Sequence, residues 1–251
     1  MALHDCFGKL IGKSVVDFNS RQIDALPTAV TSGIADISET LMHARNYRAM
    51  GFSIFKMKTG MNVEEDIEKV IKLSEEFGRS VTLRLDANQG YSKASLVHFL
   101  SKTNEVPIEL IEQPLPVGSE KELMNLADQE RMKFVADESL IDQASAKQWS
   151  VDPKPFGIFN IKLMKCGGIR SSRMIADIAK QAGISLFWGC NDESICSISA
   201  ALHAAYSQPH TKYIDLDGSF DLQRDVVEGG FELKNGNLLL PDQPGLGIRW
   251  R

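Results

Sequence analysis

The chain alternates short apolar runs with longer amphipathic stretches between residues 27 and 217. The apolar runs are rich in Val, Ile and Phe, as buried strands are, while the stretches between them repeat apolar residues at helical spacing. Gly51, Gly78 and Gly183 each end a helical stretch just before a strand, where a helix C-cap is expected. Eight strands are predicted, at residues 27–34, 53–58, 80–86, 107–113, 133–138, 156–163, 184–190 and 212–217.

Helices are predicted between these strands, at residues 37–50, 63–78, 92–103, 119–130 and 170–183 among others. Eight strands separated by helices predict an α/β fold of the TIM-like barrel type, which typically takes about 250 residues. An open doubly wound sheet is the alternative. No G-x-G-x-x-G follows an early strand, so the dinucleotide-binding form of that sheet lacks its fingerprint.

The segment from Val226 onward has a different pattern, with a hairpin predicted around Asn235-Gly236 and Gly/Pro-rich coil after it. An isolated hairpin is only marginally stable, so this segment is expected to pack on another part of the protein. We therefore divide the chain into a barrel domain at 1–225 and a C-terminal hairpin and tail at 226–251. The first residues have helical spacing, without a preceding strand.

Composition excludes several classes of protein. The 251 residues are 43% hydrophobic with a net charge of -5, which gives no sign of nucleic-acid or acidic-membrane partners. The four cysteines have no zinc-binding spacing, and His4-Asp5 interrupts any signal-peptide-like apolar run. No apolar run approaches the roughly 18 residues of a membrane helix. A cytoplasmic protein with reduced thiols is predicted, and the sequence leaves a homo-oligomer open.

Charged residues end seven of the predicted strands. In a barrel of this type, chemistry is found at the C-terminal ends of the strands. The residues at these ends are Lys56, Lys58, Asp86, Glu112, Asp137, Lys162, Glu193, Asp215 and Asp217. Taken singly, Asp137 could cap a helix, Asp86 could form an Asx turn, and Glu112 could face a loop.

Taken together, Asp86, Glu112 and Asp137 end three successive strands, with a lysine-bearing strand on either side. Three neighbouring carboxylates repel one another unless a cation holds them, and a site made of carboxylates suits Mg²⁺. A substrate carboxylate on that ion would place its α-carbon between Lys58 and Lys162. One lysine could then remove the α-proton while the other returns a proton to the opposite face.

Lys56 has a separate predicted use. Lysine normally titrates near 10.4, which is too high for an efficient base at neutral pH. A second ammonium two residues away and a divalent ion both disfavour the charged form of Lys58. The predicted chemistry is therefore removal of a proton α to a carboxylate, and racemisation or epimerisation follows if both lysines act.

The K-x-K of strand two, the carboxylates of the next three strands and the Lys before Gly167-Gly168 resemble the enolase superfamily, particularly its muconate-lactonizing-enzyme subgroup. The resemblance covers the chain from about residue 2 to its end. It implies a (β/α)7β-type barrel with Lys58 and Lys162 as acid/base residues. It also implies three Mg²⁺ ligands, Asp86, Glu112 and Asp137, and a substrate-carboxylate contact at Lys56.

Asp215-Leu216-Asp217 resembles the D-x-D of the dipeptide epimerases, which binds the free ammonium group of the dipeptide. The resemblance implies epimerisation of L-Ala-D/L-Glu or a related dipeptide at its C-terminal residue, often in murein peptide metabolism. It also places Glu193 where the family often has an acidic residue on strand seven. A turn-forming Asp pair before Gly218 is the plain structural alternative.

The family also has an N-terminal α+β capping domain that closes the site and sets specificity, and no segment of the 251 residues corresponds to it. We expect the tail at 226–251 to be the part that packs on this domain in the family. Two alternatives stay open: a muconate cycloisomerase or o-succinylbenzoate synthase on the same scaffold, and a catalytically silent truncated barrel.

Overall fold

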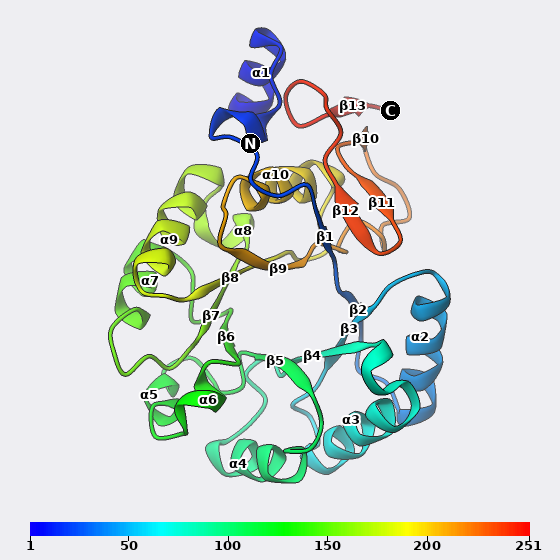
Figure 1. The fold of residues 1–251 in the computed structure, drawn as a ribbon, viewed down its shortest axis with the longest axis vertical. Helices are drawn as coiled ribbons and strands as arrows, with labels where there is room; N and C mark the ends of the chain where they lie inside the picture. Colours follow the sequence, from blue (N-terminus) through cyan, green and yellow to red (C-terminus); the bar gives the residue numbers. More distant parts are fainter. The chain divides into compact units, whose positions relative to one another are not determined.

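The computed structural model describes residues 1–251, and its main sheet consists of eight parallel strands, ordered along the sheet as they are along the chain (Figure 1). Seven of them lie inside the predicted ranges, and the last begins one residue before its range. The strands are β2 (Val30–Ser32), β3 (Ile54–Lys58), β4 (Thr82–Asp86), β5 (Ile108–Glu112), β6 (Phe134–Ala136), β7 (Ile158–Ile161), β8 (Ser185–Gly189) and β9 (Thr211–Asp215). Successive parallel strands in this order are typical of an α/β barrel.

Helices connect these strands, and several begin at a side-chain cap. Asp36, Asn62 and Ser92 each accept a hydrogen bond from a backbone N–H of the first turn. The helices are α2 (Ile37–Ala49), α3 (Val63–Phe77), α4 (Lys93–Lys102), α5 (Glu120–Leu123), α6 (Asp128–Arg131), α7 (Gln143–Trp149), α8 (Leu163–Cys166), α9 (Ile169–Gln181) and α10 (Ile195–Tyr206).

The single helix predicted at 119–130 is wrong, because this segment forms the two short helices α5 and α6. The Glu130 carboxylate accepts a hydrogen bond from the Ala127 N–H at 3.2 Å, which begins a new helix at Asp128. Asn125 and Asp128 also favour caps and turns over helix interiors, because their side chains compete for backbone hydrogen bonds.

The chain divides into two compact units, and each buries apolar side chains. The first unit comprises Met1–Thr28, Ile141–Lys147 and Asn160–Arg251, and the second comprises Ala29–Leu140 and Gln148–Phe159. In the first unit Trp188 is fully buried, and its Nε1 donates to Thr211 Oγ1 at 3.0 Å. In the second unit Phe99 and Phe134 are fully buried.

The C-terminal segment forms the predicted hairpin, with β11 (Glu232–Lys234) paired to β12 (Asn237–Leu239). Asn235 and Gly236 have φ angles of 50° and 75°, as the tight turn of such a hairpin requires. Strand β1 (Ala25–Pro27) pairs with the other edge of β12, so the hairpin packs on the beginning of the chain. Strands β10 (Val227–Gly229) and β13 (Ile248–Trp250) form a second pair. The domain boundary at 225/226 stays a prediction.

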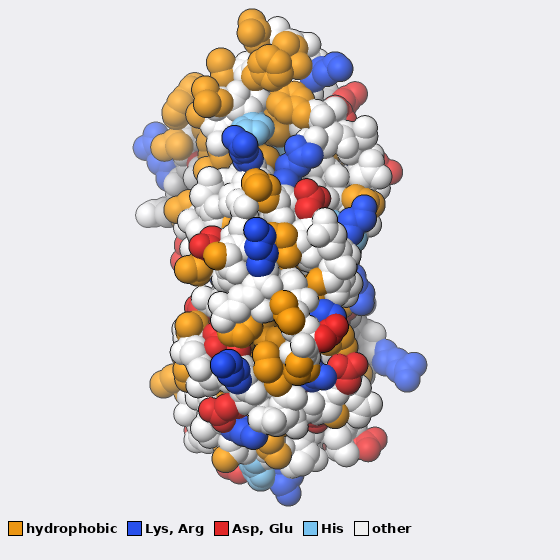
Figure 2. Space-filling model, turned by 90° about the vertical axis from the view of Figure 1, so that its left-hand side faces the viewer, with side chains coloured by type: hydrophobic (Ala, Val, Ile, Leu, Met, Phe, Trp, Pro, Cys, Tyr) orange, Lys and Arg blue, Asp and Glu red, His pale blue; other side chains and the backbone are white.

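The N-terminal helix α1 (Ala2–Ile11) carries several exposed apolar side chains, including Leu3 at 85% and Leu10 at 80% exposure. Hydrophobic side chains gather at the top of Figure 2, the end of the view where α1 lies in Figure 1. On its inner side, Asp5 Oδ1 accepts a hydrogen bond from the Leu246 N–H at 2.8 Å. The chain contains no helix with the length and apolar character needed to cross a membrane.

His203 of α10 is buried in the first unit, where its Nδ1 accepts a hydrogen bond from the Val16 N–H at 3.1 Å. Burial lowers the pKa of His203 to about 4, and Arg21 acts in the same direction, while the Leu246 backbone and Asp5 oppose it. The folded protein therefore keeps this ring neutral at pH values at which the unfolded chain protonates it.

We predict that this ring makes stability depend on pH. Above its unfolded pKa of 6.5 both states are neutral, and stability is then lost as pH falls toward the folded value of about 4. Urea unfolding should show a loss from His203 of roughly 2 kcal/mol between pH 7 and pH 5. The His203→Gln variant has no titrating ring at this position, so its free energy of unfolding should fall by roughly 2 kcal/mol less than that of the unmodified protein over the same pH range. An equal loss in both proteins, or an NMR titration of the ring near pH 6.5, would contradict the prediction.

Candidate functional site

Lys56 and Lys58 extend from β3 toward the same carboxylate. Lys56 Nζ lies 3.3 Å from Asp86 Oδ2 and 2.7 Å from Glu112 Oε2. Lys58 Nζ lies 2.8 Å from the same Asp86 oxygen and 2.6 Å from Asn88 Oδ1. Because alternate strand residues face one side, one carboxylate can meet both ammonium groups. The Lys56 side chain is 5% exposed and that of Lys58 is 31% exposed, so the second lysine is the more accessible one.

Asp86 and Glu112 face each other across the register of β4 and β5, and both are almost completely buried. Asp86 uses its other oxygen, Oδ1, to accept a hydrogen bond from the Asn88 N–H at 3.0 Å, as an Asx turn does. Burial raises the pKa of Asp86, but the nearby Lys56 and Lys58 ammonium groups outweigh it and hold that pKa below its usual value. The carboxylate is therefore kept ionised.

Asp137 follows β6 and is positioned through its backbone by a buried glutamine. Gln113 Oε1 accepts hydrogen bonds from the N–H groups of Asp137 at 3.0 Å and Ser139 at 3.1 Å. Gln113 Nε2 donates to Ser139 Oγ at 2.8 Å and to the Leu115 carbonyl at 3.0 Å. Ser139 Oγ in turn donates to Glu120 Oε1 at 2.7 Å. The buried Gln113 amide thus uses both its donors and its acceptor to hold this loop.

The three carboxylates fit a magnesium ion by their chemistry. Asp86, Glu112 and Asp137 are each at most 3% exposed, and the charge of Asp137 opposes the lysines in their lowering of the Asp86 pKa. Hard divalent ions bind such carboxylate oxygens. As the side chains stand, no three acidic, Cys or His groups close around one point. Instead the Lys56 ammonium lies against Asp86 and Glu112, and it meets the same need for positive charge.

Acidic residues of the first unit gather around Cys190, at the ends of β8 and β9. Cys190 Sγ lies 3.3 Å from the Asp215 carbonyl oxygen and 4.0 Å from Asp217 Oδ1, and it accepts a hydrogen bond from the Gly218 N–H at 3.3 Å. Burial raises the pKa of the Cys190 thiol well above its usual value, and the charges of Asp217, Asp215 and Glu193 raise it further. Negative charge therefore converges on this point.

Glu193 is fixed within this cluster by its own hydrogen bonds. Its carboxylate accepts from the Asn191 N–H at 2.9 Å and from the Ser197 hydroxyl of α10. Asp217 begins a turn, since its carbonyl accepts the Phe220 N–H at 2.8 Å. The turn-forming interpretation of the Asp pair and its interpretation as an ammonium site are therefore compatible, because the turn uses the backbone of Asp217.

Lys162 directly follows β7 and precedes α8, and its side chain is half-buried. Lys165, one turn later, donates to the Asn160 carbonyl at 3.2 Å, which ties α8 to the strand. Lys162 belongs to the first unit with Glu193 and the Asp pair, whereas Lys58 and the three carboxylates belong to the second unit.

Sequence reasoning did not identify Gln113 or Cys190, and it considered Asn88 only as part of a turn. Gln113 and Asn88 have φ angles of 33° and 41°, in the left-handed region that few side chains tolerate. These φ angles mark Asn88 and Gln113 as unusual neighbours of Asp86 and Glu112, but they can be recognised only in the folded backbone. Cys190 looks like an ordinary apolar residue at a strand end, and no sequence signal separates it.

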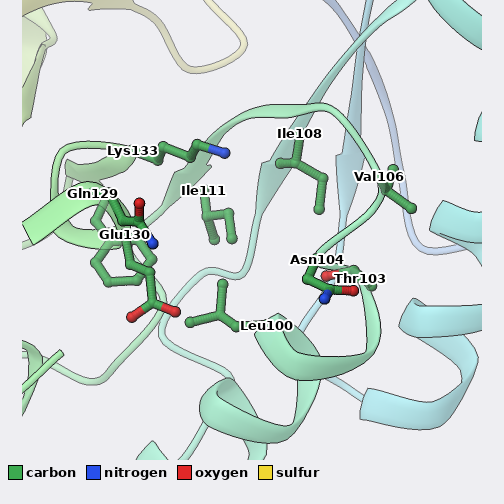
Figure 3. A pocket seen from close by; sticks show the side chains of 10 residues that line it. Leu100, Thr103, Asn104, Val106, Ile108, Ile111, Gln129, Glu130 and Lys133 are labelled. Atoms are coloured by element: carbon green, nitrogen blue, oxygen red, sulfur yellow. The ribbon is translucent and has the colours of Figure 1, made fainter. Parts of the chain in front are cut away.

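A cavity of about 310 Å³ in the second unit lies away from this chemistry. Figure 3 shows side chains entering it from α4, β5 and the start of β6, among them Leu100, Ile108 and Lys133. These residues mark the N-terminal ends of β5 and β6, whereas Glu112 and Asp137 lie at their C-terminal ends. Active sites of such barrels occupy the C-terminal ends, so we do not assign the reaction to this cavity.

Comparison with known proteins gives consistent matches. The family model described as "Enolase C-terminal domain-like" matches residues 39–251. Proteins named L-Lys-D/L-Arg epimerase from Desulforapulum autotrophicum and Methylococcus capsulatus are 51% and 47% identical over 249 and 248 residues. An L-Ala-D/L-Glu epimerase from Clostridium acetobutylicum is 32% identical over 250 residues. Each match covers 99% of this chain and 70% of the relative.

Solved structures agree with the sequence matches. The crystal structure of the Methylococcus capsulatus dipeptide epimerase with Mg and the dipeptide L-Arg-D-Lys superposes with a TM-score of 0.97 at 47% identity. The superposition covers 100% of this chain and 71% of that chain. The predicted α/β-barrel fold is therefore confirmed.

We predict that Gln113→Met destabilises the protein and its carboxylate loop. The substitution keeps the volume but leaves the Asp137 and Ser139 N–H groups without their acceptor, which should cost about 2–4 kcal/mol of unfolding free energy. Chemical denaturation of Gln113→Met against Gln129→Met, at an exposed glutamine, measures the difference. Equal stability of the two variants would show that Gln113 does not hold the loop.

Proposed function

We propose a specific reaction for this chain from one premise: it belongs to the enolase superfamily, within the dipeptide epimerases of the muconate-lactonizing-enzyme subgroup, and is an isomerase. The proposed reaction is 1,1-proton transfer at the α-carbon of the C-terminal residue of a cationic dipeptide, as in L-Lys-D/L-Arg. The observation that carries this choice is the identity of about half with two L-Lys-D/L-Arg epimerases.

The choice replaces the expectation of L-Ala-D/L-Glu as first substrate. Relatives of that name match at 28–32% identity. The charge of the site also supports a cationic substrate, since the carboxylates of Glu193, Asp215 and Asp217 all raise the pKa of the Cys190 thiol. A role in murein peptide metabolism stays a prediction from the resemblance.

Lys58 and Lys162 are the proposed acid/base pair. A neutral lysine amine takes the proton as the α-carbon–hydrogen bond breaks, and the bonding electron pair moves toward the carboxylate. The other lysine, protonated, delivers its proton to the opposite face of the same carbon, which inverts the configuration. Asp86 Oδ2 and Asn88 Oδ1 bind Lys58 Nζ at 2.8 and 2.6 Å and fix its direction. Orienting the base in this way lowers the entropic part of the barrier.

Asp86, Glu112 and Asp137 are the proposed holders of Mg²⁺. When bound, the ion would supply positive charge for the negative charge that develops on the substrate carboxylate. A relative at 47% identity has been crystallised with this ion. Lys56 lies between two of these carboxylates and, in this proposal, also faces the substrate carboxylate as a second positive charge.

Asp215 and Asp217 are the proposed contacts for the free α-ammonium of the dipeptide, with Glu193 nearby. A charge-assisted hydrogen bond to a carboxylate is about twice as strong as a neutral one, so this pair can fix the N-terminal end of the substrate. A muconate cycloisomerase substrate has no such ammonium group, which makes this pair the discriminating feature between the two alternatives.

We expect that the protein with Mg²⁺ exchanges the α-proton of L-Lys-L-Arg in D₂O and forms both epimers. Lys162→Ala should lower the rate of epimerisation by a factor of about 10³ or more. It should still allow deuterium exchange from one stereoisomer, because one base remains. Proton NMR and chiral chromatography measure the two outcomes. The matched control is Lys165→Ala, three residues away on α8.

Retention of full epimerisation by Lys162→Ala would contradict the two-base proposal. Absence of α-proton exchange with every cationic and acidic dipeptide, at any Mg²⁺ concentration, would favour the silent barrel instead. Preference for L-Ala-L-Glu over L-Lys-L-Arg would overturn only the proposed specificity.

We also predict that Asp217→Asn reduces kcat/KM for L-Lys-L-Arg by about tenfold or more, because a charged acceptor for the ammonium group is lost. The same variant should treat an N-acetylated dipeptide, which lacks that charge, much as the unmodified protein does. Parallel kinetics on both substrates provide the test. An equal loss on both substrates would mean that Asp217 does not bind the ammonium group.

A further inference from the structure

A second cavity, of about 260 Å³, lies among the outer helices of the first unit. It is lined by residues of α1, the 3-10 helix η1 (Val15–Phe18), α9 and α10, and none of them ends a barrel strand. Its polar lining residues are His4, Asn19, Arg173, His203 and Ser207. Figure 2 shows a histidine and basic side chains together just below the apolar end of the molecule. The lining contains no carboxylate.

His203 lines this cavity and carries a buried, unsatisfied hydrogen-bond donor. Its Nδ1 accepts the Val16 N–H at 3.1 Å, so the neutral ring carries its proton on Nε2. The residue is 1% exposed, and Nε2 has no hydrogen-bond partner. The Leu246 backbone carbonyl acts on the ring as a hydrogen-bond acceptor and raises its pKa, but its geometry leaves Nε2 without a full hydrogen bond. A buried donor without an acceptor costs about 1–3 kcal/mol, so an acceptor in the cavity would be stabilising.

Arg173 presents a second donor and a full charge. Its Nε is buried without a hydrogen-bond partner, and no carboxylate forms an ion pair with its guanidinium. His4 lies close enough for the Arg173 charge to help lower the His4 pKa, after burial. Arginine is suited to binding carboxylate and phosphate groups through two parallel hydrogen bonds.

The surrounding charges leave this cavity positive. Arg21 and Asp5 both act on His203, but Asp5 is already bound by Lys9 Nζ at 2.9 Å and by the Leu246 N–H at 2.8 Å. Asp17 of η1 is exposed and does not line the cavity. Unpaired donors, a free arginine and no lining carboxylate together select a negatively charged acceptor.

We propose that this cavity binds a small oxyanion, a phosphate or carboxylate group, between Arg173 and His203, at a site separate from the one proposed for catalysis. The guanidinium and the His203 Nε2–H donate to the oxygens of the anion, and the Ser207 hydroxyl and Asn19 amide can add further hydrogen bonds. A water molecule could satisfy one donor, but it would leave the arginine charge without a counter-ion.

The test is thermal unfolding of the full chain, without Mg²⁺ or dipeptide, in potassium phosphate and in potassium acetate, with potassium chloride keeping ionic strength constant. A ligand that binds only the folded state raises Tm in a saturable way. Phosphate and acetate titrations separate the two kinds of oxyanion. Arg173→Gln should weaken the response about tenfold. The matched control is Arg170→Gln, an exposed arginine on the same helix outside the lining.

A saturable rise in Tm that Arg173→Gln weakens and Arg170→Gln preserves supports the site. NMR of the His203 Nε2–H signal provides a readout that does not depend on a variant, and it should shift with the same anion concentration. The proposal is overturned if Tm does not rise with phosphate or acetate beyond its value in chloride at the same ionic strength. It is also overturned if both arginine variants respond equally, or if no anion shifts the His203 signal. Because no reaction is measured, failure here is distinguishable from failure of the proposed epimerase activity.

Discussion

The contact on which the site depends is the burial of the Lys56 ammonium between Asp86 and Glu112. An ammonium and two carboxylates could not each be removed from water alone, since an unpaired buried charge costs several kcal/mol. Their strand register brings them together, and the ion pairs make burial tolerable. In the same arrangement, Lys58 lies beside the shared Asp86 oxygen, and its side chain stays partly open to solvent. The structure thus separates a buried lysine, which balances charge, from a more accessible one.

The alternation of apolar runs and helical stretches was sufficient to locate the eight strands, because buried parallel strands carry a strong apolar signal. It failed at residues 119–130, where the capping by Glu130 competes with a weak helical pattern. Spacing also identified the charged strand-end residues. It could not identify Gln113, whose role depends on a left-handed backbone angle and on hydrogen bonds to a neighbouring loop. Such contacts depend on the folded backbone and not on the spacing of apolar residues along the sequence.

The two polar clusters differ in how they are stabilised. Around Asp86, opposite charges balance one another within hydrogen-bonding distance. Around Cys190, the Glu193 carboxylate is held by a backbone N–H group and a hydroxyl. Neutral donors of this kind fix the direction of a carboxylate without adding a counter-charge.

The pairing of β1 with β12 has a consequence for synthesis of the chain. Residues 25–27 pair with residues 237–239, which are synthesised much later, whereas all residues of the second unit have been added once synthesis passes residue 159. Long-range pairings of this kind form late, because the chain between them must first be enclosed. The residues of the second unit are therefore all synthesised before the first unit receives its final strands. During that interval the edge of β1 is exposed to chaperones and to neighbouring chains.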